Sequence, residues 1–294
     1  MIRYFFAIVT LLIFLPTYGV NVLAHNNEGI NRTCLQGVLT LLKNKGNKVK
    51  GANILVYNDE GVDRTCLQWV LTFFKNRGNK VKDVNADFLI NDTKWITQYD
   101  RLVIPGGADC PYHKKLKGVG CDNIKKFVEN GGTYIGICAG GYFGSKKVEF
   151  GLGTDIEVNE YRELAFFPGI ARGPMLKPYA YDSEDGASAA KIRSSIDGSI
   201  FYSYHNGGST FVLDEINQNG TEVLAEYADE NNAPAVIRCK YGKGQAILSG
   251  IHFEANQKLL YSTSPREELD KIKPIAEKVG STAEIKDHFL ESVL

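Results

Sequence analysis

Cys138 is the residue best placed to act as a nucleophile. It lies in the segment Gly-Ile-Cys-Ala-Gly-Gly, directly after an apolar stretch at 133–137 that predicts a strand. This pattern is typical of a nucleophile elbow, a sharp turn from a strand into a helix, in which Gly136 and Gly140 leave room for the strained backbone. A helix N-terminus and a neighbouring imidazole can lower the pKa of a thiol there. The alternative is a small buried cysteine at a tight turn.

His252 and Glu254 supply the remaining groups that cysteine catalysis needs. A base must take the thiol proton, and a carboxylate must orient that base. The pair follows a predicted strand at 245–250, and in an extended segment alternate side chains point to the same side. The sequence therefore predicts a catalytic triad of Cys138, His252 and Glu254. The alternative for a single histidine at a strand end is a structural role.

Backbone amides could complete this site. Gly106 and Gly107 follow the predicted strand 101–104, and their amides could approach a substrate oxyanion together with the amide of Ala139. All of these residues come at the carboxyl ends of strands, where open α/β sheets bind ligands. Tyr204 and Asn206, at the end of another predicted strand, are candidates for the wall of a substrate pocket. A turn with an incidental aromatic residue explains them equally well.

The other reactive side chains give weaker signals. No Cys-x-x-Cys or His-x-x-x-His spacing occurs, so the sequence predicts no metal site and no cofactor. The chain has six cysteines. If Cys138 stays free, five remain, and at least one more cannot pair within the chain. Cys110 and Cys121 flank one loop and are the best candidates for a disulfide in an oxidising compartment.

The elements that must position these residues predict an α/β fold. Short apolar strands alternate with helices as far as residue 137, which indicates a mostly parallel sheet covered by helices on both faces, in three layers. Shorter strands follow, including 164–167, 222–227 and a hairpin at 235–250, whereas 183–190 reads as a loop. Two amphipathic helices are expected in the tail, at 265–279 and 281–294.

The N-terminal region predicts export. An apolar run at 5–15 follows Arg3 and is broken by Pro16, which is typical of a cleavable signal peptide at 1–24 and of a secreted or periplasmic protein; an uncleaved anchor is the alternative. Cleavage after Gly19 or after Ala24 fits equally. Residues 26–50 then recur at 58–82, with about 18 of 25 positions identical. We interpret 25–50 as a duplicated partial β-α unit and 51–294 as the functional domain.

Composition narrows the range of partners. The 294 residues carry 34 basic and 34 acidic side chains, so the formal charge is zero. A neutral chain has no electrostatic footprint for nucleic acid or for an anionic membrane after the signal is removed. A small-molecule or peptide substrate is the expected partner, and no protein partner can be named from the sequence.

Four segments together resemble a known family. They are Pro-Gly-Gly-Ala-Asp-Cys-Pro-Tyr (105–112), Gly-Ile-Cys-Ala-Gly-Gly-Tyr-Phe (136–143), Lys-Val-Glu-Phe (147–150) and His-Asn-Gly-Gly (205–208). With Ser-Gly-Ile-His-Phe-Glu (249–254), they are similar to the class I glutamine amidotransferase-like superfamily, and within it to the N-terminal domain of eukaryotic-type biotin–protein ligases. The resemblance implies a flavodoxin-like three-layer fold, with Cys138 as nucleophile, His252 as base and Glu254 as its partner.

Two functions remain open on the sequence. The first is an exported cysteine-dependent hydrolase that acts on an amide, γ-glutamyl or peptide bond. The second is a non-catalytic module that keeps the pocket and binds a small ligand. Biotin ligation is not expected, because the Gly-Arg-Gly-Arg type of biotinyl-adenylate loop is absent from the sequence. Phe253 stands where many amidotransferases carry proline, which changes the stiffness of the His-x-Glu turn but removes no functional group.

Overall fold

The computed structural model describes residues 51–176, 179–180, 183–213 and 219–294. Within them, Ala52–Leu294 form one compact unit. The predicted signal peptide and the first repeat copy lie outside the described residues, so both stay predictions. No helix of the described part is long and apolar enough to cross a membrane.

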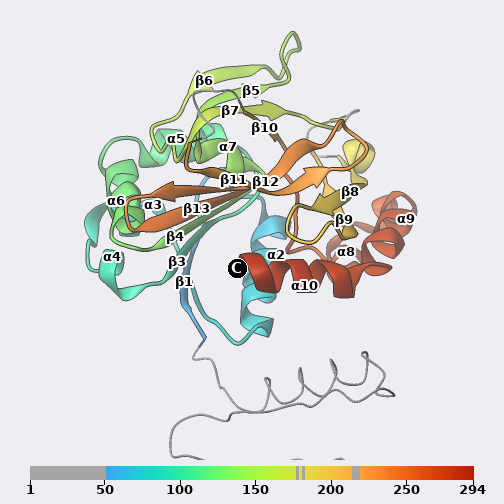
Figure 1. Cartoon of the computed structure of the whole chain (residues 1–294), viewed down its shortest axis with the longest axis horizontal. Coiled ribbons are helices and arrows are strands. Elements are labelled where there is room, and N and C mark those ends of the chain that lie inside the picture. Colours follow the sequence, from blue (N-terminus) through green and yellow to red (C-terminus); the bar gives the residue numbers. More distant parts are fainter. Residues whose placement is uncertain (1–50, 177–178, 181–182, 214–218) are drawn as a thin grey trace, which may run out of the picture. The chain divides into compact units, whose positions relative to one another are not determined.

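A nine-stranded sheet forms the centre of this unit (Figure 1). Its strands β2, β1, β3, β4 and β13 run parallel, whereas β12, β11, β8 and β9 continue the sheet by antiparallel pairing. In spatial order the strands are β2 (Lys80–Val84), β1 (Asn53–Tyr57), β3 (Arg101–Ile104), β4 (Thr133–Ile137), β13 (Gly244–Ser249), β12 (Ala233–Tyr241), β11 (Thr221–Tyr227), β8 (Ser188–Ser194) and β9 (Ile200–His205).

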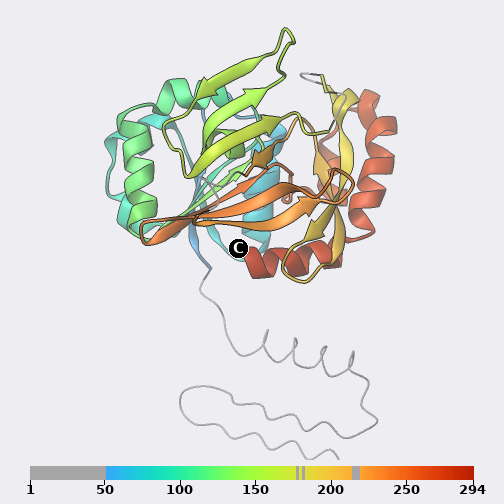
Figure 2. The same ribbon diagram turned by 45° about the horizontal axis from the view of Figure 1, so that its top comes forward.

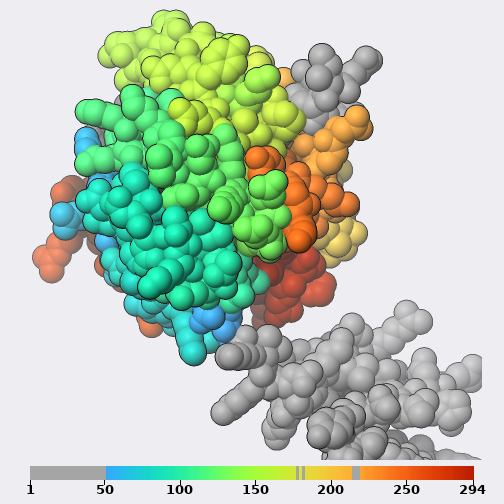
Figure 3. Space-filling model, turned by 90° about the vertical axis from the view of Figure 1, so that its left-hand side faces the viewer, coloured from blue at the N-terminus to red at the C-terminus, as the bar shows by residue number. Residues whose placement is uncertain are grey.

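Helices cover both faces of the parallel half, which confirms the three-layer α/β fold. Leu55 and Leu102 face one helical layer, and Ile54 and Val103 face the other, so the strands are apolar on both sides. The first layer presents a continuous surface, in teal and green in Figure 3. It contains α3 (Ala86–Asn91), α4 (Trp95–Gln98), α5 (Asp109–Leu116), α6 (Val119–Glu129) and α7 (Ala139–Phe143).

The second layer consists of helices from the two ends of the domain. Helix α2 (Arg64–Asn76) contributes Phe73 and Phe74, and helix α10 (Ala283–Val293) contributes Phe289 and Leu290 to one buried cluster. Helices α8 (Gln257–Thr263) and α9 (Leu269–Gly280) pack beside it, with the short turns η1 (Glu184–Gly186) and η2 (Arg266–Glu268).

A separate four-stranded sheet lies over the first helical layer (Figure 2, yellow-green). In spatial order it contains β10 (Thr210–Val212), β7 (Phe167–Gly173), β5 (Ser145–Phe150) and β6 (Val158–Tyr161). Phe150, Phe167 and Phe211 from this sheet share a buried cluster with α5 and α7. A buried ion pair adds to that contact, because Arg162 Nε donates to Asp109 Oδ2 over 2.8 Å.

Several expectations from the sequence need correction. The segment 164–167 is not a strand: Leu164 and Phe166 are core residues of a connection, and β7 begins only at Phe167. The predicted loop at 183–190 contains η1 and the start of β8. Helix α8 was not expected. Cys110 and Cys121 are both free thiols, Cys110 in contact with Arg162 and Cys121 in the core, so the candidate disulfide is wrong.

We expect Arg162→Met to lower the free energy of unfolding by about 3–5 kcal/mol, because it leaves the carboxylate of Asp109 buried without its partner. Lys191→Met is the control, since it removes a cation from an exposed pair with Asp229 and should change stability little. Urea unfolding curves of both variants measure the difference, and equal midpoints would contradict the expectation.

Candidate functional site

The turn at Cys138 has the geometry of a nucleophile elbow. Strand β4 ends at Ile137, and helix α7 begins at Ala139, so that Cys138 alone makes the turn with φ 52° and ψ −107°. A positive φ is rare for a residue with a side chain. A Cβ added to Gly140 would lie 2.1 Å from the oxygen of Ile104, and one added to Gly136 would lie 2.2 Å from the oxygen of Gly140. The flanking glycines are therefore required by backbone contacts.

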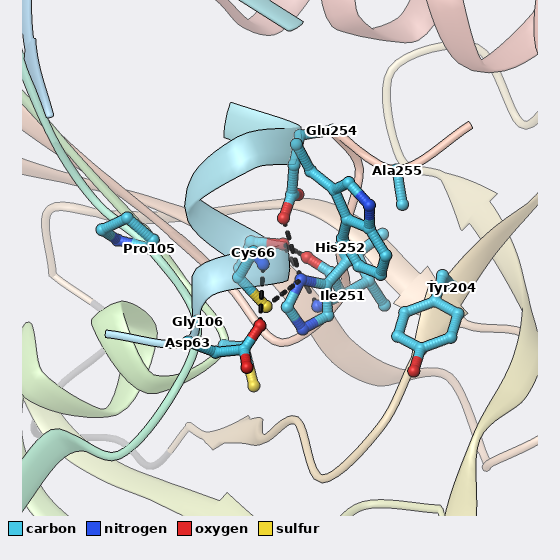
Figure 4. A network of polar contacts seen from close by, with 12 residues as sticks. Asp63, Cys66, Pro105, Gly106, Tyr204, Ile251, His252, Glu254 and Ala255 are labelled. Atoms are coloured by element: carbon cyan, nitrogen blue, oxygen red, sulfur yellow. Dashed lines mark hydrogen bonds and ion pairs between the residues drawn. The ribbon is translucent and has the colours of Figure 1, made fainter. Parts of the chain in front are cut away.

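His252 and Glu254 form a buried pair. His252 Nδ1 and Glu254 Oε1 are 2.8 Å apart, and the exposed fractions of the two residues are 2% and 0%. Figure 4 shows the carboxylate pointing at the imidazole ring. The segment that contains the pair is held in place by hydrogen bonds of its backbone. His252 N–H donates to Tyr204 O over 2.9 Å, and the hydroxyl of Ser203 donates to His252 O over 3.1 Å. The two side chains meet as expected, but the segment is a turn rather than extended, because Ala255 N–H donates to His252 O over 3.2 Å.

The surroundings of His252 favour the protonated form of its imidazole. Burial is the largest single influence and acts to lower the pKa of His252, but the neighbouring groups, the Glu254 carboxylate first among them, together outweigh it, so that this pKa is raised well above its usual value. With Nδ1 committed to Glu254, the Nε2 atom is the position at which the imidazole can exchange a proton with a thiol or a substrate.

Cys138 and His252 meet because their strands are neighbours. Strands β4 and β13 pair in parallel, with Ser249 opposite Ile137, so both chains leave the sheet at the same edge. Cys138 N–H donates to Ser249 O over 2.8 Å, and this hydrogen bond joins the ends of the two strands directly. The Cys138 side chain is also close enough to His252 to raise the pKa of the imidazole. The three residues predicted as a triad are therefore brought together.

The predicted amide donors are Gly106, Gly107 and Ala139, and the structure places Gly106 beside the imidazole of His252. A Cβ added to Gly106 would lie 2.7 Å from His252 Cε1, which places Gly106 beside the imidazole. Gly107 packs against Gly61, whose oxygen accepts the next amide along the chain, that of Ala108. Ala139 occupies the first position of α7, where backbone N–H groups have no acceptor within the helix. An oxyanion site at these amides remains a prediction.

Tyr204 and Asn206 both line the centre. The Tyr204 ring lies 5.6 Å from that of His252, and its hydroxyl donates to Glu184 Oε2 over 2.6 Å. The Asn206 side chain donates to Ser183 O over 3.0 Å, while its backbone oxygen lies 3.8 Å from Cys138 Sγ. Both residues are thus positioned near the thiol and the imidazole, and Asn206 Oδ1 is buried there without a hydrogen-bond partner among the described residues.

Sequence reasoning missed two neighbours of His252 on helix α2. Cys66 Sγ lies 4.0 Å from His252 Nδ1, and the Trp69 ring lies 5.8 Å from the imidazole ring. Burial raises the pKa of the Cys66 thiol to about 12. A signal was available: α2 follows β1, so its first turn comes at the carboxyl edge of the sheet. Among the described residues no cluster of His, Cys, Asp and Glu could hold a metal ion.

We expect Glu254→Gln to lower the pKa of His252, because burial then acts without the carboxylate. A raised pKa stabilises the fold below pH 6.5, the ordinary value for histidine, and loses this effect as pH rises through the raised value. In the variant the dependence reverses, and stability falls as pH drops below 6.5. NMR titration of the imidazole measures the change.

Glu222→Gln is the control for this substitution, because Glu222 is an exposed carboxylate paired with Arg238. An unchanged imidazole titration in Glu254→Gln would contradict the assignment of Glu254 as the dominant charge on His252.

Comparisons with known proteins identify the fold and the family of this chain. The crystal structure of a glutamine amidotransferase from Thermotoga maritima superposes with a TM-score of 0.54 at 13% identity, over 82% of this chain and 95% of that one. At this identity the likeness concerns the fold, which is amidotransferase-like. A biotin–protein ligase of Schizosaccharomyces pombe is 40% identical over 168 residues, which are 54% of this chain and 26% of the ligase.

A second relative is an uncharacterised protein of Chlamydia muridarum, 39% identical over 173 residues, which are 58% of this chain and 66% of that protein. The chain thus spans about a quarter of the length of the ligase and two thirds of the chlamydial protein. The sequence model of the family described as "Biotin-protein ligase, N terminal" matches residues 52–294. The chain therefore belongs to the biotin–protein ligase N-terminal domain family.

Proposed function

We propose that this protein is an exported cysteine-dependent hydrolase that cleaves an amide, γ-glutamyl or peptide bond through a thioester. The observation that carries the proposal is the meeting of an elbow cysteine with a buried His–Glu pair at the ends of two paired parallel strands. The predicted signal peptide is the support for export. The ligase relative is matched over only 26% of its length, so its activity is not transferred to this chain.

The proposed reaction uses three side chains. Cys138 transfers its proton to His252 and attacks the carbonyl carbon of the substrate, while Glu254 stabilises the imidazolium. The C–N bond breaks as His252 returns the proton to the leaving nitrogen. Water then loses a proton to the same imidazole and attacks the thioester, and the acid product leaves as the thiol of Cys138 is restored.

The remaining residues of the site would bind and orient the substrate in this scheme. The amides of Gly106, Gly107 and Ala139 are the candidate donors to the oxyanion, and Gly106 lies beside His252. Tyr204 and Asn206 form the wall next to the thiol and the imidazole. The neutral composition of the chain fits a small-molecule or peptide substrate rather than nucleic acid.

The test is covalent labelling with 6-diazo-5-oxo-norleucine, an electrophilic glutamine analogue, followed by peptide mass spectrometry. We expect one label, on Cys138 in the wild type, and none in Cys138→Ala. His252→Asn should slow labelling by about a hundredfold or more, because the general base is lost.

Cys110→Ser is the matched control, since that thiol contacts Arg162 away from the site and its loss should leave labelling intact. Labelling that persists in Cys138→Ala would exclude Cys138 as the nucleophile. If the wild type is not labelled at all and its Cys138 is alkylated with the pH dependence of an ordinary thiol, the protein is a ligand-binding module instead.

A further inference from the structure

Lys286 is a buried cation that contacts the residue following the His252–Glu254 pair. It lies on helix α10 with an exposed fraction of 3%, and its ammonium donates to the backbone oxygen of Ala255, the residue after Glu254. A lysine is almost never fully buried unless its charge has a partner. Lys286 Nζ thus holds the chain at the point where the segment with His252 and Glu254 leaves the site.

Glu254 is the charged residue that acts most strongly on Lys286. Glu254 is fully buried and uses one carboxylate oxygen for His252, while its other oxygen has no hydrogen-bond partner among the described residues. The groups that act on Lys286 are the carboxylates of Glu254 and of Asp287 on the same helix, and the cation of Arg77 on α2. Burial lowers the pKa of Lys286 to about 8, and Glu254 opposes that shift more strongly than Asp287 does.

Helix α10 is anchored so that it can hold this lysine in place. The rings of Phe289 and Phe201 lie 5.1 Å apart, which packs the helix on β9. Arg77 forms an ion pair with Asp287, and Arg101 donates to the backbone oxygen of Leu294. These contacts join the end of the chain to α2, β3 and β9, so the ammonium has a fixed position relative to the sheet.

We propose that Lys286 is a positioning residue for the candidate triad. It fixes the backbone after Glu254 and supplies a buried positive charge that helps to keep this carboxylate directed at His252. This inference rests on the proposed hydrolase function for its catalytic meaning, but the coupling of Lys286 to Glu254 can be measured without any activity.

The coupling is tested on protein labelled with ¹³C-lysine, by NMR titration of the Lys286 side chain. We expect Lys286 to titrate near pH 8 in the wild type and at lower pH in Glu254→Gln, because the carboxylate that favours the charged lysine is gone. Glu222→Gln, which removes an exposed carboxylate, should leave the titration unchanged. Equal Lys286 titrations in Glu254→Gln and wild type would overturn the proposal.

The positioning role is tested by the labelling rate of Cys138 with 6-diazo-5-oxo-norleucine. We expect Lys286→Met to label about tenfold more slowly than wild type, because the acid is held less firmly. Its thermal stability should be lower, because the backbone oxygen of Ala255 and the buried carboxylate of Glu254 lose the nearby ammonium. Lys273→Met, an exposed lysine on α9, should match the wild type in both measurements.

The outcomes separate this inference from the proposed function. A wild-type labelling rate in folded Lys286→Met would overturn the positioning role. If the wild type itself is not labelled, the hydrolase proposal fails, whereas the NMR titration still decides whether Lys286 and Glu254 are coupled. If Lys286→Met does not fold, the titrations of the wild type and of Glu254→Gln decide the proposal alone.

Discussion

The hydrogen bond from Cys138 N–H to Ser249 O is the interaction on which the site depends. It forms where two parallel strands end, and it fixes the strained backbone at Cys138 against the strand that leads to His252. The strain of a positive φ persists only if the surroundings define that conformation. Here the backbone oxygens near Gly136, Gly140 and Gly141 leave no space for a side chain, so the elbow has one conformation available.

Two thiols lie near the same imidazole, and their surroundings explain why only one suits a nucleophile. Cys66 sits in the first turn of α2, where its amide donates to the carboxylate of Asp63. Burial is the main cause that raises its pKa, and the carboxylates of Asp63 and Glu254 add to the effect, so Cys66 stays a neutral thiol near neutral pH. Cys138 instead directly precedes helix α7, and its thiol lies 3.8 Å from Asn206 O.

Local patterns in the sequence located the two segments, around Cys138 and around His252, that the structure brings to the same edge of the sheet. The elbow and the His-x-Glu segment each occupy a few consecutive residues at predicted strand ends, whereas the parallel pairing of β4 with β13 that unites them joins strands far apart in the sequence. Cys66, Trp69 and Lys286 could not be found in this way. The first lies 186 positions from His252, and the lysine reaches the site only because α10 packs back onto β9. Packing between distant segments leaves no short motif.

The errors in the predicted elements have a related cause. Leu164 and Phe166 are apolar because they fill the core under the four-stranded sheet, and apolar runs of this length fit a buried connection as well as a strand. In 188–190, small residues form the start of an antiparallel strand next to β9, where pairing rather than side-chain propensity decides. Fold class was therefore easier to predict than the elements beyond residue 148.

The buried charges make the site a coupled unit rather than a set of independent side chains. His252, Glu254 and Lys286 are each almost fully buried, and their charges are screened little by water. Glu254 contacts His252 directly, and Lys286 is hydrogen-bonded to the backbone of the next residue, Ala255. The C-terminal helix, which takes no direct part in the proposed chemistry, thereby holds the backbone next to the His252–Glu254 pair.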